Sequence, residues 1–203
     1  MKLTYKDGKK DKIHIYIEEE YTLTVDRDFF LNLGIKNGYD ISCDELNELT
    51  QKITTRRAFN KAVDLLSRRD HSKKELIDKL KQKGYGSDFE EVFEKLESYG
   101  YLDDERFARN YVKQLIDFKA FGKMRIKQEL IRKGIDRDLI SEILEEIEPD
   151  EDALVQLIER KYMRNLTDEK GIKRTFNTLV RLGYSYSEIK SALSAVNEMM
   201  DSE

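Results

Sequence analysis

The sequence of 203 residues contains no tryptophan, one proline and one cysteine, Cys43. A single cysteine excludes an internal disulfide framework and a cysteine-based zinc site, so we expect a reducing compartment. The chain also lacks an apolar run near the roughly 18 residues of a membrane span, and its first residues lack the apolar segment of a signal peptide. We therefore expect a soluble, cytoplasmic protein without a membrane partner.

Charge is abundant but unevenly placed. Charged residues make up 38% of the chain and hydrophobic residues 39%, which favours thin, well-solvated helical layers over a compact sheet protein. The net charge of −4 argues against attraction of the whole molecule to nucleic acid. Basic residues nonetheless dominate residues 52–83, 119–137 and 160–181, whereas residues 88–97 and 136–148 are mostly acidic.

A glycine that ends a helix recurs at a constant period. Gly84, Gly134 and Gly183 are separated by 50 and 49 residues. A glycine can adopt the left-handed conformation after the last helical turn, and the next residue then folds back onto an apolar residue of that turn. The apolar pairs that fit this pattern are Leu80 with Tyr85, Leu130 with Ile135, and Leu179 with Tyr184. Three copies at one period predict a repeat protein.

The first 50 residues differ from the rest. Short β-branched and aromatic runs at residues 3–5, 13–17 and 21–25 predict an antiparallel hairpin or a three-strand meander. A short helix over residues 28–33 and a turn at Gly38–Tyr39 are expected next. Because so few strands are rarely stable alone, we expect this module to pack on the next part of the chain.

Capping boxes mark predicted helix starts after that point. Each joins a serine to a glutamate three residues later, beginning at Ser42, Ser72, Ser87 and Ser185. With the apolar positions at helical spacing, they predict a module of residues 1–50 and three repeats of three helices over residues 51–101, 102–148 and 149–203. The expected fold is mainly α: an elongated tandem array of three three-helix repeats with a small N-terminal β-hairpin or meander.

Helix ends and caps account for the residues at the junction between the first two repeats without any functional role. Gly100 ends one helix, Asp103 is a natural N-cap for the next, and Asp104 suits the positive end of its dipole. The stretch from Gly100 to Ala108, with Tyr111, nonetheless resembles the signature of the RecX family of recombination regulators. So do Gly122-x-x-Arg-Ile-x-x-Glu-Leu-x-x-Lys-Gly134-Ile and the similar stretch from Ser72 to Tyr85. The residues that carry the family motif are Asp103, Asp104, Arg106, Phe107, Arg109 and Tyr111.

This resemblance implies a non-enzymatic regulator without a cofactor. Members of the family lodge in the groove of the filament that RecA recombinase forms on single-stranded DNA. They modulate, and usually inhibit, ATP hydrolysis and strand exchange by RecA, and some also bind DNA. The implied setting is DNA recombination, DNA repair and the SOS response, and we expect a monomer.

The basic second helix of each repeat is the candidate binding surface. Placing Ile126 and Leu130 inward would leave Arg125, Gln128 and Arg132 on one outward side. The candidate residues for binding RecA or DNA are Lys73, Lys74, Lys81, Lys83, Arg125, Lys127, Arg132, Lys133, Arg174 and Arg181. The series is not strictly periodic, because Glu75 stands in the first repeat where the other two carry Arg125 and Arg174.

Other functional classes have less support. Neither His14 nor His71 has an evident metal or nucleophile partner in the sequence, and no phosphate-binding glycine loop is present. Two alternatives remain open. One is a DNA-binding regulator that uses its basic helices as a helix-turn-helix independently of RecA, and the other is a scaffold for other proteins. A lysine-rich helix can also be an ordinary solvated face.

Overall fold

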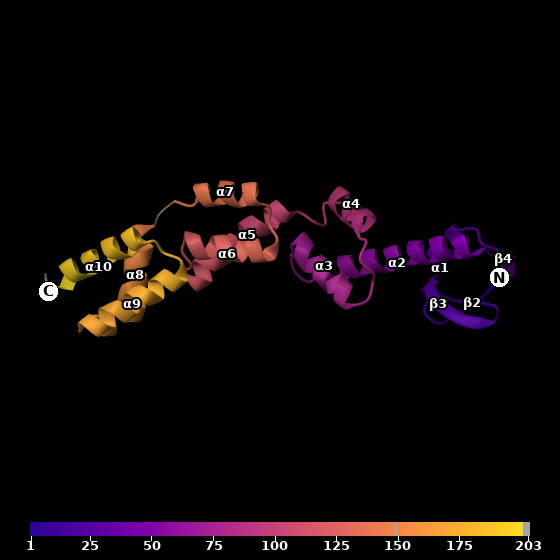
Figure 1. Cartoon of the computed structure of the whole chain (residues 1–203), viewed down its shortest axis with the longest axis horizontal. Helices are drawn as coiled ribbons and strands as arrows, with labels where there is room; N and C mark the ends of the chain where they lie inside the picture. Colours follow the sequence, from indigo (N-terminus) through magenta and orange to yellow (C-terminus); the bar gives the residue numbers. More distant parts are fainter. Residues whose placement is uncertain (149, 201–203) are drawn as a thin grey trace. The chain divides into compact units, whose positions relative to one another are not determined.

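The computed structural model describes residues 1–148 and 150–200 (Figure 1). The fold is mainly helical with a small N-terminal sheet, as expected. The elements in chain order are β1 (Lys2–Asp7), β2 (Lys12–Ile17), β3 (Glu20–Asp26), α1 (Arg27–Asn32), β4 (Tyr39–Asp40), α2 (Cys43–Leu66), α3 (Lys73–Gln82), α4 (Glu90–Ser98), α5 (Asp104–Lys119), α6 (Lys123–Lys133), α7 (Arg137–Glu146), α8 (Glu151–Tyr162), the 3-10 helix η1 (Met163–Asn165), α9 (Glu169–Leu182) and α10 (Tyr186–Met200).

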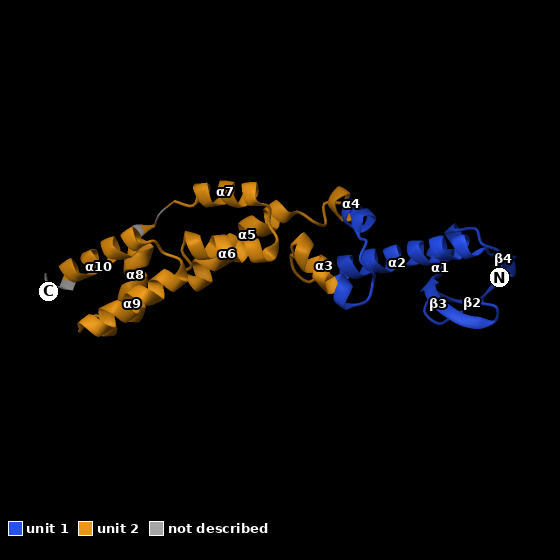
Figure 2. Ribbon diagram, in the orientation of Figure 1, with its two compact units in different colours: residues 1–64, 80–95 blue, residues 65–79, 96–203 orange. Residues whose placement is uncertain are grey.

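The chain divides into two compact units (Figure 2). Unit 1 comprises residues 1–64 and 80–95, and unit 2 comprises residues 65–79 and 96–203. Helix α2 is continuous from Cys43 to Leu66 and so runs through residue 50, where the sequence suggested a boundary. The proposed division into a module and three repeats stays a prediction.

The sheet of unit 1 is an antiparallel meander with an added strand. Its order is β3-β2-β1-β4. Alternate residues of the strands, such as Leu3, Ile15 and Val25, are buried in one core with Leu49 and Ile53 of α2. The small module therefore gains its stability by packing on α2, as expected.

Strand β4 was not predicted. Gly38 has a φ of +81° and forms a turn, but the following Tyr39 and Asp40 pair with Leu3 and Lys2 of β1. The predicted turn is therefore confirmed at Gly38, but the prediction is wrong for Tyr39, which lies in a strand. A strand of two residues is too short to carry an alternating pattern, so its pairing is decided by tertiary contact.

Two of the four predicted capping boxes are confirmed in full. Glu45 and Ser42 exchange side chain to backbone hydrogen bonds of 2.8 and 3.2 Å, and Ser185 and Glu188 do the same at 2.6 and 3.2 Å. The prediction at Ser87 is wrong. Helix α4 begins at Glu90, whose N–H donates to Asp88 Oδ1 at 3.2 Å, because the aspartate carboxylate lies nearer to this helix start.

The glycine stops are confirmed. Gly84, Gly134 and Gly183 have φ values of +77°, +76° and +95°. After each, the backbone N–H of the next residue donates to the carbonyl five residues earlier, at 3.2, 3.1 and 3.3 Å. Gly100 ends α4 in the same way, with φ of +68°. These bonds satisfy carbonyls that a helix end leaves unpaired.

Two hydrophobic cores can be followed in the described part of unit 2. Helices α5, α6 and α7 enclose one of them, which includes Leu115, Ile126 and Ile143. Helices α8, α9 and α10 enclose the other, which includes Ile158 and Leu179. Each core therefore belongs to one of the predicted three-helix groups.

The start of α6 lies against the end of α9. The N–H of Gly122 donates to the carbonyl of Leu182 at 2.8 Å, and that of Met124 donates to the carbonyl of Gly183 at 3.1 Å. A Cβ at Gly183 would lie 2.3 Å from the backbone nitrogen of Arg125. Gly183 is thus required both for its φ and for the close approach of α6.

None of the helices in the described part of the chain combines the length and apolar content needed to cross a bilayer.

We predict that Gly183→Ala destabilises the protein more than Gly100→Ala does. Both glycines have positive φ, but a Cβ at Gly100 would meet nothing within 4 Å. The left-handed conformation alone costs about 1 kcal/mol, whereas the additional overlap at Gly183 should raise the loss to about 3 kcal/mol. Urea unfolding followed by circular dichroism measures both losses, and equal losses would contradict the role assigned to the close approach.

Candidate partner interface

The ten candidate cations differ in exposure. Seven are exposed: Lys74, Lys81, Lys83, Lys127, Arg132, Arg174 and Arg181. Lys73, Arg125 and Lys133 are half-buried. The half-buried group lies where helices of unit 2 meet one another, so its members must be considered separately.

Arg125 packs against its neighbours instead of pointing fully outward beside Gln128. Its side chain is 31% exposed, and its guanidinium lies 2.9 Å from Glu129 and 5.4 Å from the ring centroid of Phe121. Its Nε atom is buried and, among the described residues, has no hydrogen-bond partner. Arg132 is 61% exposed and also contacts Glu129, at 3.1 Å. Arg132 is therefore the more accessible of the two.

The end of α6 is bonded to the start of α3. Lys133 Nζ lies 2.5 Å from Glu75 Oε1, and the Ser72 hydroxyl donates to the Lys133 carbonyl at 2.7 Å. Arg69 contacts the same carboxylate at 3.1 Å. The predicted capping box is therefore only half formed. Ser72 Oγ accepts the Glu75 N–H, but the Glu75 carboxylate binds Lys133 and Arg69.

The Glu75 carboxylate has a strongly shifted pKa. Burial alone would raise this pKa, but the hydrogen bonds from Lys133 and Arg69 outweigh that effect and lower it to about 2. Glu75 is thus ionised across the physiological range. The sequence marks Glu75 as unusual, because it stands where the other repeats carry Arg125 and Arg174. The sequence does not show that Lys133 binds it.

Lys73 and Lys74, at the start of α3, also bind neighbouring parts of unit 2. The backbone N–H of Lys73 donates to Asp104 Oδ1 at 2.8 Å, and burial raises the pKa of that carboxyl. Lys73 Nζ binds Glu97 at 2.8 Å, and Lys74 Nζ donates to the carbonyl of Arg132 at 3.0 Å. These contacts hold helices together, and they occupy donors of both ammonium groups that a partner could otherwise bind.

The residues of the family motif mainly build the second three-helix group. Asp103 caps α5 through the N–H of Arg106, and Phe107 is buried and stacks on Tyr111 with a centroid distance of 5.7 Å. Arg109 joins α5 to α7 by binding Glu105, Glu142 and Glu146, and its hydrogen bonds lower the pKa of the Glu146 carboxyl. Arg106 is the exposed cation of the motif, and it makes no ion pair among the described residues.

The two histidines are held by ordinary contacts. His14 Nδ1 lies 2.6 Å from Thr24 Oγ1, and His71 Nδ1 lies 2.9 Å from the carbonyl of Arg69. Burial lowers the pKa of His71. Within residues 1–148 and 150–200, no cluster of three or more His, Cys, Asp or Glu could hold a metal ion.

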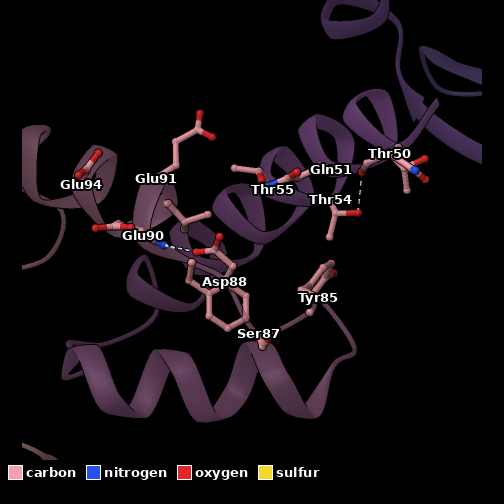
Figure 3. Close-up of a pocket in the computed structure, with 14 residues that line it drawn as sticks. Thr50, Gln51, Thr54, Thr55, Tyr85, Ser87, Asp88, Glu90, Glu91 and Glu94 are labelled. Atoms are coloured by element: carbon pink, nitrogen blue, oxygen red, sulfur yellow. Dashed lines mark hydrogen bonds between the residues drawn. The ribbon is translucent and has the colours of Figure 1, made fainter. Parts of the chain in front are cut away.

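Unit 1 contains an acidic groove of about 570 Å³ (Figure 3). One wall is the polar face of α2 and includes Thr50, Gln51 and Thr54. The other wall comes from residues 85–94, which carry four carboxylates: Asp88, Glu90, Glu91 and Glu94. The groove matches the acidic segment at residues 88–97 and suits a basic group of a partner.

Two stretches match known domains. Residues 103–144 match the second three-helix domain of RecX, and residues 58–96 match its first three-helix domain. A regulatory protein RecX of Caldanaerobacter subterraneus is 30% identical over 193 residues, which cover 93% of this chain and 95% of that protein. A regulatory protein RecX of Listeria welshimeri is 31% identical and covers 97% of this chain and 76% of its own length.

Solved structures share the fold. A crystal structure of regulatory protein RecX has a TM-score of 0.71 at 21% identity and covers 95% of this chain and 98% of its own. RecX from Lactobacillus salivarius has a TM-score of 0.63 at 24% identity and covers 71% of this chain and 97% of its own.

We predict that Glu75→Gln lowers stability above pH 4.5 and flattens its pH dependence below that value. Because the folded pKa of about 2 lies below the ordinary value of 4.5, the ionised carboxylate stabilises the fold above pH 4.5. That contribution disappears as the pH falls toward 2. The expected loss at neutral pH is about 2 kcal/mol, since Lys133 and Arg69 lose their shared carboxylate.

Urea unfolding at several pH values measures this difference. Glu145→Gln is the matched control, because Glu145 is exposed and has no ion pair among the described residues. An unchanged pH profile in Glu75→Gln would contradict the stabilising role of this carboxylate.

Proposed function

The chain belongs to the RecX family of regulatory proteins, and from that premise we propose that it binds the filament of RecA recombinase on single-stranded DNA. Binding in the filament groove inhibits ATP hydrolysis and strand exchange by RecA. The chain acts without catalysis of its own, in the cytoplasm, in recombination and DNA repair. The observation that carries this proposal is the similarity to regulatory proteins named RecX along 93% of the chain.

The exposed cations supply the contact with the filament. Lys127 and Arg132 on α6, and Arg174 and Arg181 on α9, are accessible within unit 2. Such side chains bind phosphates or partner carboxylates, and the resulting affinity falls as salt rises. Lys81 and Lys83 add two exposed cations in unit 1.

The half-buried cations have a different task. Lys133 and Lys73 hold the start of α3 to its neighbours through Glu75 and Glu97, and Arg125 packs beside α9. We assign these residues to the positioning of the basic helices. The acidic groove in turn receives a basic side chain of the partner.

Inhibition of RecA is the first test. A substoichiometric amount of this protein should lower the DNA-dependent rate of ATP hydrolysis by RecA, with the effect weakening as salt increases. An unchanged rate at every ratio and at low salt would contradict the proposal.

Sedimentation separates this proposal from direct DNA binding. The protein should pellet with RecA filaments but much less with DNA alone or with RecA alone. Tight, sequence-selective binding to duplex DNA without RecA would favour a DNA-binding regulator instead. Pelleting in none of these mixtures would favour a scaffold for other proteins.

We predict that reversing Arg132 and Arg181 to Glu weakens filament binding by about tenfold at low salt, because exposed cations that face carboxylates or phosphates become repulsive. Lys190→Glu on α10 is the matched control, since Lys190 is also exposed but lies outside the basic second helices. Co-sedimentation with RecA filaments measures the change. Equal binding of all variants would place the interface elsewhere.

Arg125→Glu should act through stability. It would place two carboxylates, those of residue 125 and Glu129, one turn apart on α6. We expect a loss of about 1 kcal/mol or more in urea unfolding, measured by circular dichroism, since the packed guanidinium is also lost. A fully stable variant that loses only filament binding would instead make Arg125 a contact residue.

A further inference from the structure

The two edges of the sheet in unit 1 are treated differently. The β1 edge is covered. Residues Lys2 and Leu3 pair with β4, and the Gly38 N–H donates to the Leu3 carbonyl at 2.9 Å. Further along, the Asn37 side chain imitates a strand, since its Oδ1 accepts the Tyr5 N–H at 2.9 Å and its Nδ2 donates to the Tyr5 carbonyl at 3.4 Å.

The opposite edge, strand β3, is open. It is the last strand in the order, and among the described residues it pairs with β2 alone. Five of its seven residues, Tyr21 to Val25, have aromatic, β-branched or aliphatic side chains that favour strand pairing. The strand contains no lysine or proline, the residues that commonly protect an edge strand from pairing with another chain. The pairing of β3 with β2 is irregular beside Tyr21. From Leu23 to Asp26 each residue of β3 pairs in regular register with β2.

Two arginines lie beside this regular half. A cavity of about 180 Å³ is lined by Thr24, Val25 and Asp26 of β3 and by Arg56 and Arg57 of α2. Both arginines are exposed, and the part of the chain that the structure describes offers neither of them an ion pair with a carboxylate. The Asp26 carboxylate is already bound by Lys12 and lies 3.4 Å from Asn60 Nδ2.

Aromatic rings lie beside the arginines. The Arg56 guanidinium lies 6.0 Å from the ring centroids of Phe29 and Phe59, and that of Arg57 lies 6.0 Å from the ring centroid of Tyr85. A guanidinium over a ring face keeps its N–H donors available for a planar carboxylate.

We propose that β3 binds an extended segment of a partner protein as an added strand, and that an acidic residue of that segment binds Arg56 and Arg57. Backbone hydrogen bonds along the open edge supply affinity, while the arginines select for acidic sequences. This site lies in unit 1, on β3 and α2, and uses none of the cations assigned to filament binding.

The charges of β3 argue for a different protein as the partner and against a second copy of this chain. Antiparallel pairing of two β3 strands about Leu23 would place Glu20 opposite Asp26 at both ends. Like charges directly opposite each other destabilise a sheet.

A synthetic peptide tests the proposal without RecA, so the outcome is independent of the proposed function. The probe is a fluorescein-labelled peptide of alternating valine and threonine that ends in two aspartates, and anisotropy at low salt measures its binding. A peptide that ends in two lysines, and one with N-methyl groups at alternate residues, should each bind at least about tenfold more weakly. The lysine peptide cannot bind the arginines, and the methylated one cannot form backbone bonds along one edge.

Protein variants locate the site. Arg56→Glu and Arg57→Glu should each weaken binding of the acidic peptide by about tenfold, whereas Lys52→Glu should not. Lys52 is an exposed cation of the same helix outside the cavity. In wild-type protein the peptide should slow hydrogen exchange of amides in residues 23–26.

The contradicting outcomes are equally specific. No binding of the acidic peptide at low salt would overturn the proposal, and so would binding that survives alternate N-methylation. Slowed exchange elsewhere with none in β3 would place the peptide at another site. If an arginine variant does not fold, as judged by circular dichroism, the methylated peptide and the exchange measurement still decide the question with wild-type protein.

Discussion

The contact between the start of one basic helix and the glycine at the end of the next organises unit 2. It occurs twice, where α3 meets Gly134 and where α6 meets Gly183. At each contact, donors at a helix start bind carbonyls that the facing helix end leaves unpaired, and opposite ends of two helix dipoles face each other. A side chain at either glycine would occupy the space of the incoming turn.

These two contacts between a helix start and a glycine, here called joints, share a geometry but differ in chemistry. At the first, Ser72 and Lys74 donate to carbonyls of α6, and Glu75 captures Lys133. At the second, backbone N–H groups make the corresponding bonds, and Gly122 allows the close approach. The first joint therefore depends on charge and responds to acid, whereas the second depends on backbone contact and on the absence of side chains.

The joints divide the cations of the basic helices into two sets. Those whose side chains face neighbouring side chains, such as Lys133 and Arg125, pack on rings and carboxylates inside unit 2. Those whose side chains face solvent, such as Arg132 and Arg181, remain accessible although they also lie in the last turns of their helices. Under the proposed function the chain acts through its surfaces, and its exposed cations, acidic groove and unpaired sheet edge suit partners of different chemistry.

The sequence by itself determined the features that depend on neighbours in the chain. The glycine stops, the caps at Ser42, Asp103 and Ser185, and the three-strand meander each arise from residues a few positions apart, so local chemistry specifies them. The tertiary structure alone decided that Glu75 binds Lys133, that Arg125 is half-buried, and that β4 joins the sheet. Glu75 and Lys133, like β4 and β1, lie far apart in the chain, and Arg125 is half-buried where α6 packs against Gly183. Packing selects one arrangement among many that composition would allow.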